Sequence, residues 1–202
     1  MFSFDELVGV LGCPPSQPEL QALLNQGRSD KSADLVEPEV KAYPDIVYHN
    51  YPALGLSFQF EPATSKTDAS KANLQDLRLA AIDVYSGHED KRWTCFPALP
   101  LTLKAARTDA VTHPLEVSIK SDTKGKDLVT DLGEPHRKGG GAGDRSGPAA
   151  WMEWSLQLKA ADTAQERKFK LQVELAGAGA RGADRWNAER AGACQWAVIT
   201  IS

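Results

Sequence analysis

The chain has 202 residues, of which 42% are hydrophobic and 25% are charged, as in ordinary globular proteins. Its net charge of −4 argues against nucleic-acid binding, which needs a basic surface to neutralise phosphates. No apolar run approaches the roughly 18 to 20 residues that cross a bilayer. Asp5 and Glu6 also stand where a signal peptide would carry basic residues. We therefore expect a cytoplasmic protein with no nucleic-acid or membrane partner.

The cysteines and histidines do not have the spacing of a metal site or a disulfide framework. Cys13, Cys95 and Cys194 are odd in number and far apart in the sequence. The four histidines lack the His-x-x-x-His spacing of helical metal ligands. We expect each cysteine to be a small buried side chain in a reducing compartment, and we predict no metal and no cofactor.

The N-terminal part of the chain predicts two short helices followed by strands. Ser3 and Glu6 have the spacing of a capping box, and so do Ser16 and Glu19. A polar stretch over residues 27–44 then leads to runs with the alternation of half-buried strands. These strands are predicted at residues 46–51, 54–61 and 77–86.

The C-terminal part predicts a similar order of elements. A helix at 126–132 is ended by Gly133 and Pro135, and a glycine-rich loop follows at 139–147. A short helix is expected at 184–191. Strands are predicted at residues 97–103, 114–119, 150–158, 167–175 and 195–201.

These elements predict an α+β fold of two helix-plus-antiparallel-sheet halves, residues 1–96 and 97–202. The segments between the strands are too short for a series of βαβ units, which argues against a parallel sheet. The two halves could pack as one unit with one continuous sheet.

Three stretches carry a resemblance to known proteins: Leu-Gly-Leu-Ser-Phe-Gln-Phe at 54–60, Asp-Leu-Gly-Glu-Pro-His-Arg-Lys-Gly-Gly-Gly at 131–141, and Trp-Met-Glu-Trp at 151–154. Together they resemble a poorly characterised family of bacterial and fungal cytosolic proteins. The element order is also similar to tandem β-lactamase-inhibitor-like domains and to the outer-membrane-assembly lipoprotein domain. In the inhibitor-like proteins the sheet presents a protein-binding face, so the resemblance implies a protein partner. The lipobox of the lipoproteins is missing, so a membrane role is not implied.

Alternation along the strands separates a core face from an outer face. A continuous sheet would gather aromatic, polar and charged side chains on its outer face, a mixture typical of recognition surfaces. The candidate partner-binding residues are Trp151, Glu153, Tyr85, Asp83, Gln59 and Lys170. The alternative is a solvated face on which Lys170 and Glu153 pair across strands.

Two glycine-rich stretches raise further candidates. Arg137, Lys138 and Arg145 flank the loop at 139–147 and could bind an anion or an acidic partner. The other interpretation of this loop is a mobile connection. A Gly-x-Gly-x-x-Gly stretch at 177–182 has too little chain after it for a dinucleotide site, so we expect a loop there.

The sequence favours a noncatalytic module that binds a protein partner through the open face of its sheet, in an inhibitor-like or immunity-like role. No catalytic residue is predicted. The alternative is an enzyme or small-molecule-binding protein with a pocket between the halves, in which Glu153, Asp83 and Tyr85 supply the polar groups. A pocket requires titratable groups that converge in a concavity, whereas a partner surface is broad and carries aromatic side chains. The oligomeric state is not predicted.

Overall fold

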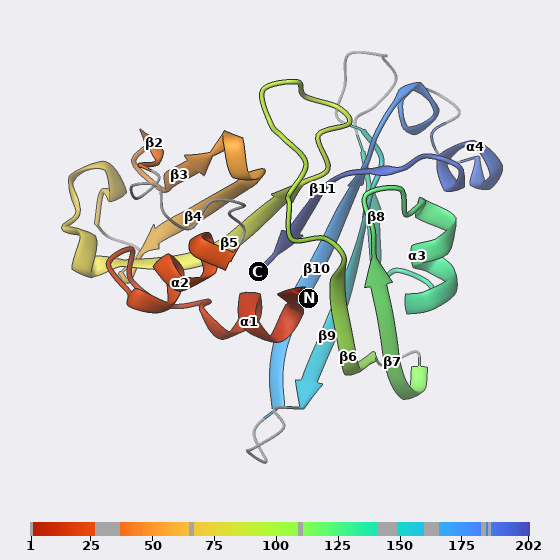
Figure 1. Cartoon of the computed structure of the whole chain (residues 1–202), viewed down its shortest axis with the longest axis horizontal. Coiled ribbons are helices and arrows are strands. Elements are labelled where there is room, and N and C mark those ends of the chain that lie inside the picture. The colour runs from red at the N-terminus through yellow and green to blue at the C-terminus, as the bar shows by residue number, and fades with distance from the viewer. Residues whose placement is uncertain are drawn as a thin grey trace.

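Short apolar runs with period-two alternation produce a structure with more strand than helix. The computed structural model describes residues 2–26, 37–64, 67–108, 111–140, 149–159, 166–182, 185 and 187–202. Within these ranges, it leaves out the side chains of residues 2, 105–108, 111–114 and 159. The prediction of an α+β protein with an antiparallel sheet and few helices is confirmed (Figure 1).

The strands of the described residues pair in the order β1-β6-β9-β10-β11-β5-β4-β3-β2, with β7 paired to β6 and β8 paired to β9. These pairs are antiparallel except for β1 with β6. The strands are β1 (Phe2–Ser3), β2 (Glu39–Ala42), β3 (Val47–Tyr51), β4 (Leu56–Pro62), β5 (Leu77–Tyr85), β6 (Leu101–Thr108), β7 (Val111–Ile119), β8 (Arg137–Gly139), β9 (Trp151–Lys159), β10 (Glu166–Leu175) and β11 (Trp196–Ile201).

The last strand of the chain connects the two halves of the sequence. β11 pairs with β10 on one side and with β5 on the other. β1, from the N-terminal half, pairs with β6 of the C-terminal half. Backbone hydrogen bonds therefore join residues 1–96 to residues 97–202 at two places.

Helices cover part of one face of the sheet and one of its ends. Figure 1 shows α1 and α2 in front of the sheet, while α3 and α4 lie at the end that carries β7 and β8. The helices are α1 (Phe4–Gly9), α2 (Pro18–Gln26), α3 (Gly125–Leu132) and α4 (Ala188–Gly192), with single 3-10 turns η1 (Pro52–Leu54), η2 (Ala69–Lys71), η3 (Leu74–Asp76) and η4 (Ala178–Ala180). None of the helices in the described ranges has the length and apolar character that a membrane span requires.

The predicted capping box starts α1. The Glu6 amide donates to Ser3 Oγ at 3.4 Å, and the Ser3 amide donates to Glu6 Oε2 at 2.9 Å. These bonds satisfy two amides that the first helical turn would otherwise leave unpaired. The second predicted box is not the start of α2, because that helix begins at Pro18, directly after Gln17 rather than Ser16.

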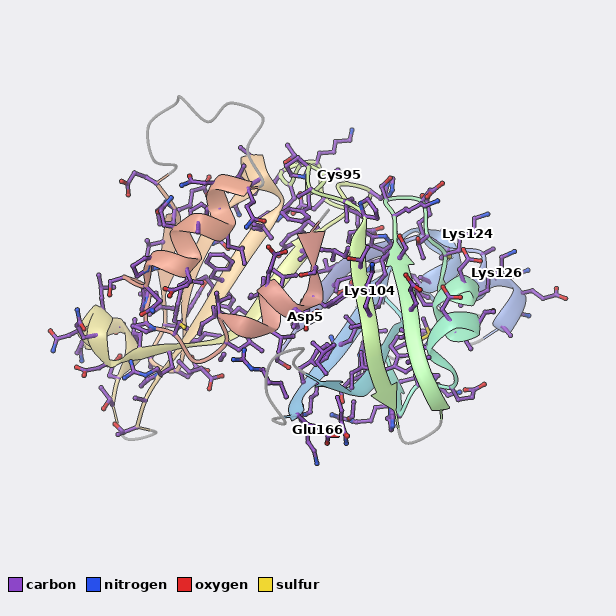
Figure 2. All side chains as sticks on the ribbon, turned by 60° about the horizontal axis from the view of Figure 1, so that its bottom comes forward. Asp5, Cys95, Lys104, Lys124, Lys126 and Glu166 are labelled. Atoms are coloured by element: carbon purple, nitrogen blue, oxygen red, sulfur yellow. The ribbon has the colours of Figure 1, made fainter. Side chains whose placement is uncertain are left out.

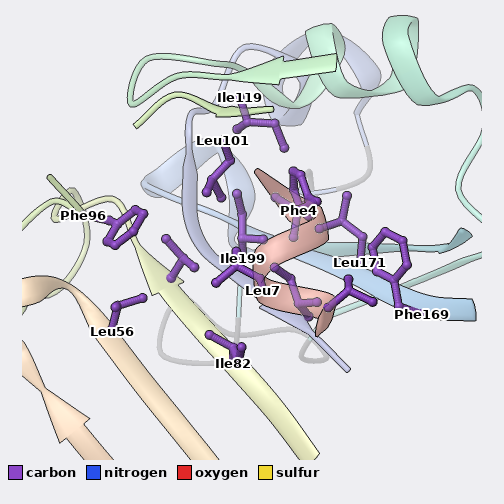
Figure 3. Packing of buried hydrophobic residues seen from close by; sticks show 14 of the residues in the cluster. Phe4, Leu7, Leu56, Ile82, Phe96, Leu101, Ile119, Phe169, Leu171 and Ile199 are labelled. Atoms are coloured by element: carbon purple, nitrogen blue, oxygen red, sulfur yellow. The ribbon is translucent and has the colours of Figure 1, made fainter. Parts of the chain in front are cut away.

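The core lies between α1, α2 and the sheet. Phe4 and Leu7 of α1 are fully buried, and Figure 3 shows them among Leu171 and Ile199 of the central strands. The Phe4 ring centroid lies 6.2 Å from that of Phe169. Burying each such side chain contributes about 1.5–3 kcal/mol to stability. The four inward positions predicted on each of β9 and β10 are all buried, which confirms the strand parity assigned from the sequence.

Further expectations also differ from the structure. β2 lies in the predicted polar linker. All four of its residues are exposed, so its sequence lacks the alternation of apolar and polar residues by which a strand is predicted. β8 is too short to show a period. The predicted burial of the cysteines is wrong: Cys95 is exposed, and Cys13 and Cys194 are partly exposed.

Candidate functional site

Polar side chains line up across the open face, which is the face of the sheet opposite α1 and α2. Directly paired residues of antiparallel strands point to the same side, so the pairing register shows which residues are aligned. One residue from each of eight neighbouring strands forms the polar row: Glu39, Asn50, Ser57, Asp83, Thr200, Gln172, Glu153 and Arg137. Asp83 and Glu153 are both predicted site residues, but β11 and β10 lie between them. Their backbones are therefore about 14 Å apart.

The centre of the polar row is buried and hydrogen-bonded. Asp83 is 8% exposed. Its two carboxylate oxygens accept from Gln59 Nε2 and from Thr200 Oγ1, each at 2.7 Å. On the neighbouring strands, Ser57 Oγ donates to Asn50 Oδ1 at 2.8 Å. The floor of the open face is thus an internally satisfied polar network, the usual condition for stable buried polar groups.

Burial also changes the ionisation of this network. It raises the pKa of the Asp83 carboxyl, and the hydrogen bonds from Thr200 and Gln59 only partly offset the effect. Burial raises the pKa of the Tyr48 and Tyr85 phenols, and the nearby carboxylate of Asp83 raises both further. The open face therefore holds a carboxylic acid that resists ionisation beside two phenols that remain neutral at physiological pH.

The segment that follows β5 folds back over the open face. Trp93 is 8% exposed and stacks on Tyr85, with ring centroids 3.8 Å apart and 2° between the ring planes. The Arg92 guanidinium lies over the Trp93 indole, 5.7 Å from its centroid, and forms an ion pair with Glu39 of β2. Tyr85 is therefore half-buried beneath Trp93, so this predicted site residue offers less free surface than alternation alone suggests.

The same segment contacts the C-terminal half of the chain. Glu89 accepts a hydrogen bond from the Gly177 amide at 2.7 Å and one from Arg181 at 2.9 Å. Gly177 is the first glycine of the predicted Gly-x-Gly-x-x-Gly loop. Its backbone amide therefore donates to a carboxylate of this chain, that of Glu89. Residues 86–93 are thus held by β2 on one side and by the turn after β10 on the other.

A depression of about 470 Å³ lies over this part of the open face. We call it the aromatic depression, because three of the four tyrosines of the chain line it. Tyr43 is 49% exposed, and its ring meets the ring of Tyr48 edge to face at 6.1 Å. The lining includes Tyr43, Tyr48, Tyr85, Trp93, Asp83 and Arg92.

The remaining predicted partner-binding residues lie farther along the sheet. Glu153 is 6% exposed and pairs with Arg137, whose NH1 atom is 3.3 Å from Glu153 Oε1. The Arg137 guanidinium also covers the half-buried Trp151 ring, 5.8 Å from its centroid. Lys170 lies opposite Ser155 rather than Glu153, so the cross-strand pair considered from the sequence does not form.

The predicted anion-binding residues separate in the structure. Arg137 is paired across β8 and β9 with Glu153, and Lys138 with Met152, so the two basic side chains point to opposite faces. Arg145 lies outside the described residues. A site that uses all three residues stays a prediction.

The structure therefore brings together Asp83, Gln59 and Tyr85 of the six predicted partner-binding residues, and adds Tyr43 and Trp93 to them. Tyr43 follows an exposed strand that shows no alternation, so the sequence gives no signal for its position. Trp93 is buried against the candidate site, where it stacks on Tyr85.

The described residues contain no group of three or more His, Cys, Asp or Glu side chains that could hold a metal ion. Both oxygens of Asp83 already accept hydrogen bonds from neighbouring side chains. Comparisons of the chain with protein-family models, with curated proteins and with solved structures find no match.

Proposed function

We propose that this chain is a noncatalytic binding module that recognises a protein partner through the aromatic depression of its open face. The observation that carries the proposal is the gathering of Tyr43, Tyr48, Tyr85 and Trp93 around one open concavity. Tyrosine and tryptophan provide rigid contact area with few rotatable bonds, and they dominate the binding energy of many interfaces. An inhibitor-like or immunity-like role is the form of this proposal that the resemblance implies.

The rim of the depression adds charge to the aromatic surface. Lys41, Asp45 and Arg92 line it together with the tyrosines. Lys41 and Asp45 are exposed, so they can pair with a partner's side chains at little cost of desolvation. An aromatic centre with a charged, solvent-accessible rim is the usual anatomy of a protein interface.

The floor of the depression favours a protein partner over a small molecule. Asp83 accepts from Gln59 and Thr200, and Ser57 donates to Asn50, so these groups are already satisfied within the chain. A small ligand depends on a few convergent polar groups to orient it. A protein partner instead gains from contact area and shape, which the aromatic rings provide.

A small-molecule site in the same place is the second candidate. The volume of about 470 Å³ lies within the ordinary range of ligand pockets. The pocket considered from the sequence was placed between the halves, with Glu153 as a polar group. The depression instead lies over β2–β5 with Asp83 and Tyr85 in its lining, while Glu153 is paired with Arg137 on β9.

The tandem arrangement of two inhibitor-like halves is also a proposal. Its support is the element order, in which α1 and α2 precede β2–β5, and α3 precedes β9–β11. The pairing of β5 with β11 would place the two units edge to edge.

The test compares the proteins captured from a lysate of the source organism by four immobilised baits. These are the unchanged chain, Tyr43→Ala, Trp151→Ala and the control Lys104→Glu. Tyr43 and Lys104 are both exposed, and Lys104 of β6 is not among the residues that line the depression. A protein captured by the unchanged chain and by Lys104→Glu, but lost with Tyr43→Ala, supports the proposal.

The captured protein is then purified and its affinity measured by calorimetry. Truncation of an aromatic hot-spot residue costs about 2 kcal/mol or more, so Tyr43→Ala should weaken binding by roughly thirtyfold. The affinity of Trp151→Ala measures how far the contact with the partner extends toward β9. The unfolding temperature of this variant should stay within a few degrees of that of the unchanged chain, because Trp151 is only half-buried. Equal capture by all four baits would exclude the open face as the binding surface.

A further inference from the structure

A second cavity lies at the other end of the molecule, where α3 and α4 meet the sheet. Its volume is about 380 Å³, and its lining shares no residue with that of the aromatic depression. The walls come from α3, α4, β8, β9 and the end of β10. We call it the α3–α4 cavity. It is independent of the proposed partner surface.

The interior of this cavity is apolar. Met152 and Leu175 form its sheet side and are both buried, while Val129 of α3 and Ala191 of α4 form the helical side. The volume lies within the range of small-molecule sites, and apolar walls of this kind would enclose a hydrocarbon group.

Two glycines fix the distance between the helical walls. A Cβ atom on Gly125 would lie 3.2 Å from the Ala191 carbonyl oxygen and 3.2 Å from a Leu175 methyl. A Cβ atom on Gly192 would lie 3.3 Å from Lys126 Cβ. The two helices are therefore packed closely at these glycines, and a larger residue at either position would push them apart.

The charged residues of the lining are mostly basic. Lys126, Lys138 and Arg185 line the cavity, against the single carboxylate of Glu134 among the described residues. They come from α3, β8 and the segment before α4, and Figure 2 shows Lys126 on α3 beside α4. Arg185 NH1 donates to the Gly182 carbonyl oxygen at 2.8 Å, which holds this side chain in place. The charge of the lining therefore complements an anion.

We propose that the α3–α4 cavity binds a small amphipathic carboxylate, with its hydrocarbon chain between Met152, Leu175 and Val129 and its carboxylate near the basic residues. An apolar interior favours the chain by about 25 cal/mol per Å² of buried apolar surface. The lysines and the arginine select a negative head group over a neutral or positive one. The sequence grouped Lys138 with Arg137 and Arg145 as a candidate anion site; here Lys138 lines the cavity, whereas Arg137 is paired with Glu153.

The test is calorimetric titration of the full chain with octanoate, octanol and butyrate. Octanol keeps the hydrocarbon chain without the charge, and butyrate keeps the charge with a short chain. We expect saturable binding of octanoate to one site. Octanol and butyrate should each bind more weakly by about fivefold or more, because each lacks about 1 kcal/mol or more of the interaction.

Four variants of lining residues and one control variant locate the binding. Lys126→Glu and Lys138→Glu change exposed lysines of the lining and should each weaken octanoate binding by about fivefold. Lys104→Glu makes the same charge change at an exposed residue of β6 outside the cavity, and it should leave octanoate binding unchanged. Ala188→Trp and Thr130→Trp place an indole in the cavity from exposed positions on its two helices, and each should abolish binding.

Two indole variants are made because one of them could fail to fold. Either Ala188→Trp or Thr130→Trp tests the proposal if it keeps the unfolding temperature of the unchanged chain. The proposal is overturned if octanoate shows no saturable binding, or if octanol binds as tightly as octanoate. It is also overturned if Lys126→Glu and Lys138→Glu bind octanoate like Lys104→Glu, or if a folded indole variant retains full affinity.

Discussion

Thr200 on the last strand donates a hydrogen bond to the buried carboxylate of Asp83 on β5, at 2.7 Å and across 117 residues of sequence. The two residues are directly paired where β11 meets β5, the seam between the N-terminal and C-terminal parts of the sheet. This bond therefore belongs both to the connection between the halves and to the floor of the aromatic depression.

Replacement of Thr200 by Val should destabilise the protein. Valine keeps the shape of the side chain but removes the hydroxyl, which leaves one oxygen of buried Asp83 without this donor. The expected loss is about 1–3 kcal/mol in the free energy of unfolding, measured by urea denaturation at pH 7. Thr200→Ser retains the donor and should lose less. Equal stability of Thr200→Val and the unchanged chain would show that the bond contributes nothing.

The stability of the chain should fall as pH rises, in part through Asp83. Burial raises the pKa of this carboxyl in the folded state, whereas its unfolded value is about 3.9. The folded state therefore binds more protons than the unfolded state above that pH. The contribution of the protonated Asp83 carboxyl to the free energy of unfolding is complete below about pH 3.9. It is lost as the pH rises through the pKa of Asp83 in the folded state.

The variant Asp83→Asn isolates this effect, because the neutral amide has no proton to lose. The stability of Asp83→Asn relative to the unchanged chain should rise between pH 4 and pH 7, as measured by urea denaturation at constant ionic strength. Groups that titrate in both proteins largely cancel in the difference. The exposed control Asp122→Asn should show no comparable rise. A difference that stays constant with pH would contradict the assignment.

Alternation predicted the parts of the fold that are half-buried. β4, β9 and β10 have one apolar side, so their faces could be read from the sequence. β2 could not, because an exposed edge strand has no side to bury. The pairing of β5 with β11 also has no local signal, since register across more than a hundred residues depends on the tertiary fold.

The candidate site was only partly predictable for the same reason. Asp83 and Tyr85 could be placed on the open face from the alternation of β5. The partial burial of Tyr85 could not, because Tyr85 is covered by Trp93, which returns to the sheet from an irregular segment. Arg137 was predicted near an anion but instead pairs with Glu153, a contact set by the register of β8, a strand too short to predict.

Gly139 and Trp151 should be energetically coupled. A Cβ atom on Gly139 would lie 2.5 Å from Cε2 of the Trp151 ring, closer than packed atoms allow. Gly139→Ala should therefore cost about 1–3 kcal/mol of stability in the unchanged chain. In a Trp151→Ala background the space is open, and the same substitution should cost much less. A double-mutant cycle by urea denaturation measures the coupling, and additive effects would show that β8 does not pack on Trp151.

Gly55→Ala should be more destabilising than Gly12→Ala, although both glycines have positive φ, +60° and +82°. At Gly12 an added Cβ meets nothing within 4 Å, so the cost is the backbone strain of about 1–2 kcal/mol. At Gly55 the Cβ would also collide with the Thr94 carbonyl oxygen and approach the Phe96 amide nitrogen to 2.8 Å. These are backbone atoms of the segment that carries Trp93 onto Tyr85, so the collision should also displace the indole from the depression.

Thermal unfolding of the two glycine variants measures the difference in stability, and capture of the partner by each variant measures the displacement. Gly55→Ala should lose the protein that Tyr43→Ala loses, because part of the aromatic lining has moved. Gly12→Ala should keep it, because Gly12 is not among the residues that line the depression and its amide donates to the Leu79 carbonyl oxygen at 2.8 Å, away from Trp93. Equal costs at the two positions would mean that residues 94–96 do not pack against Gly55, and the path that brings Trp93 to Tyr85 would then be wrong.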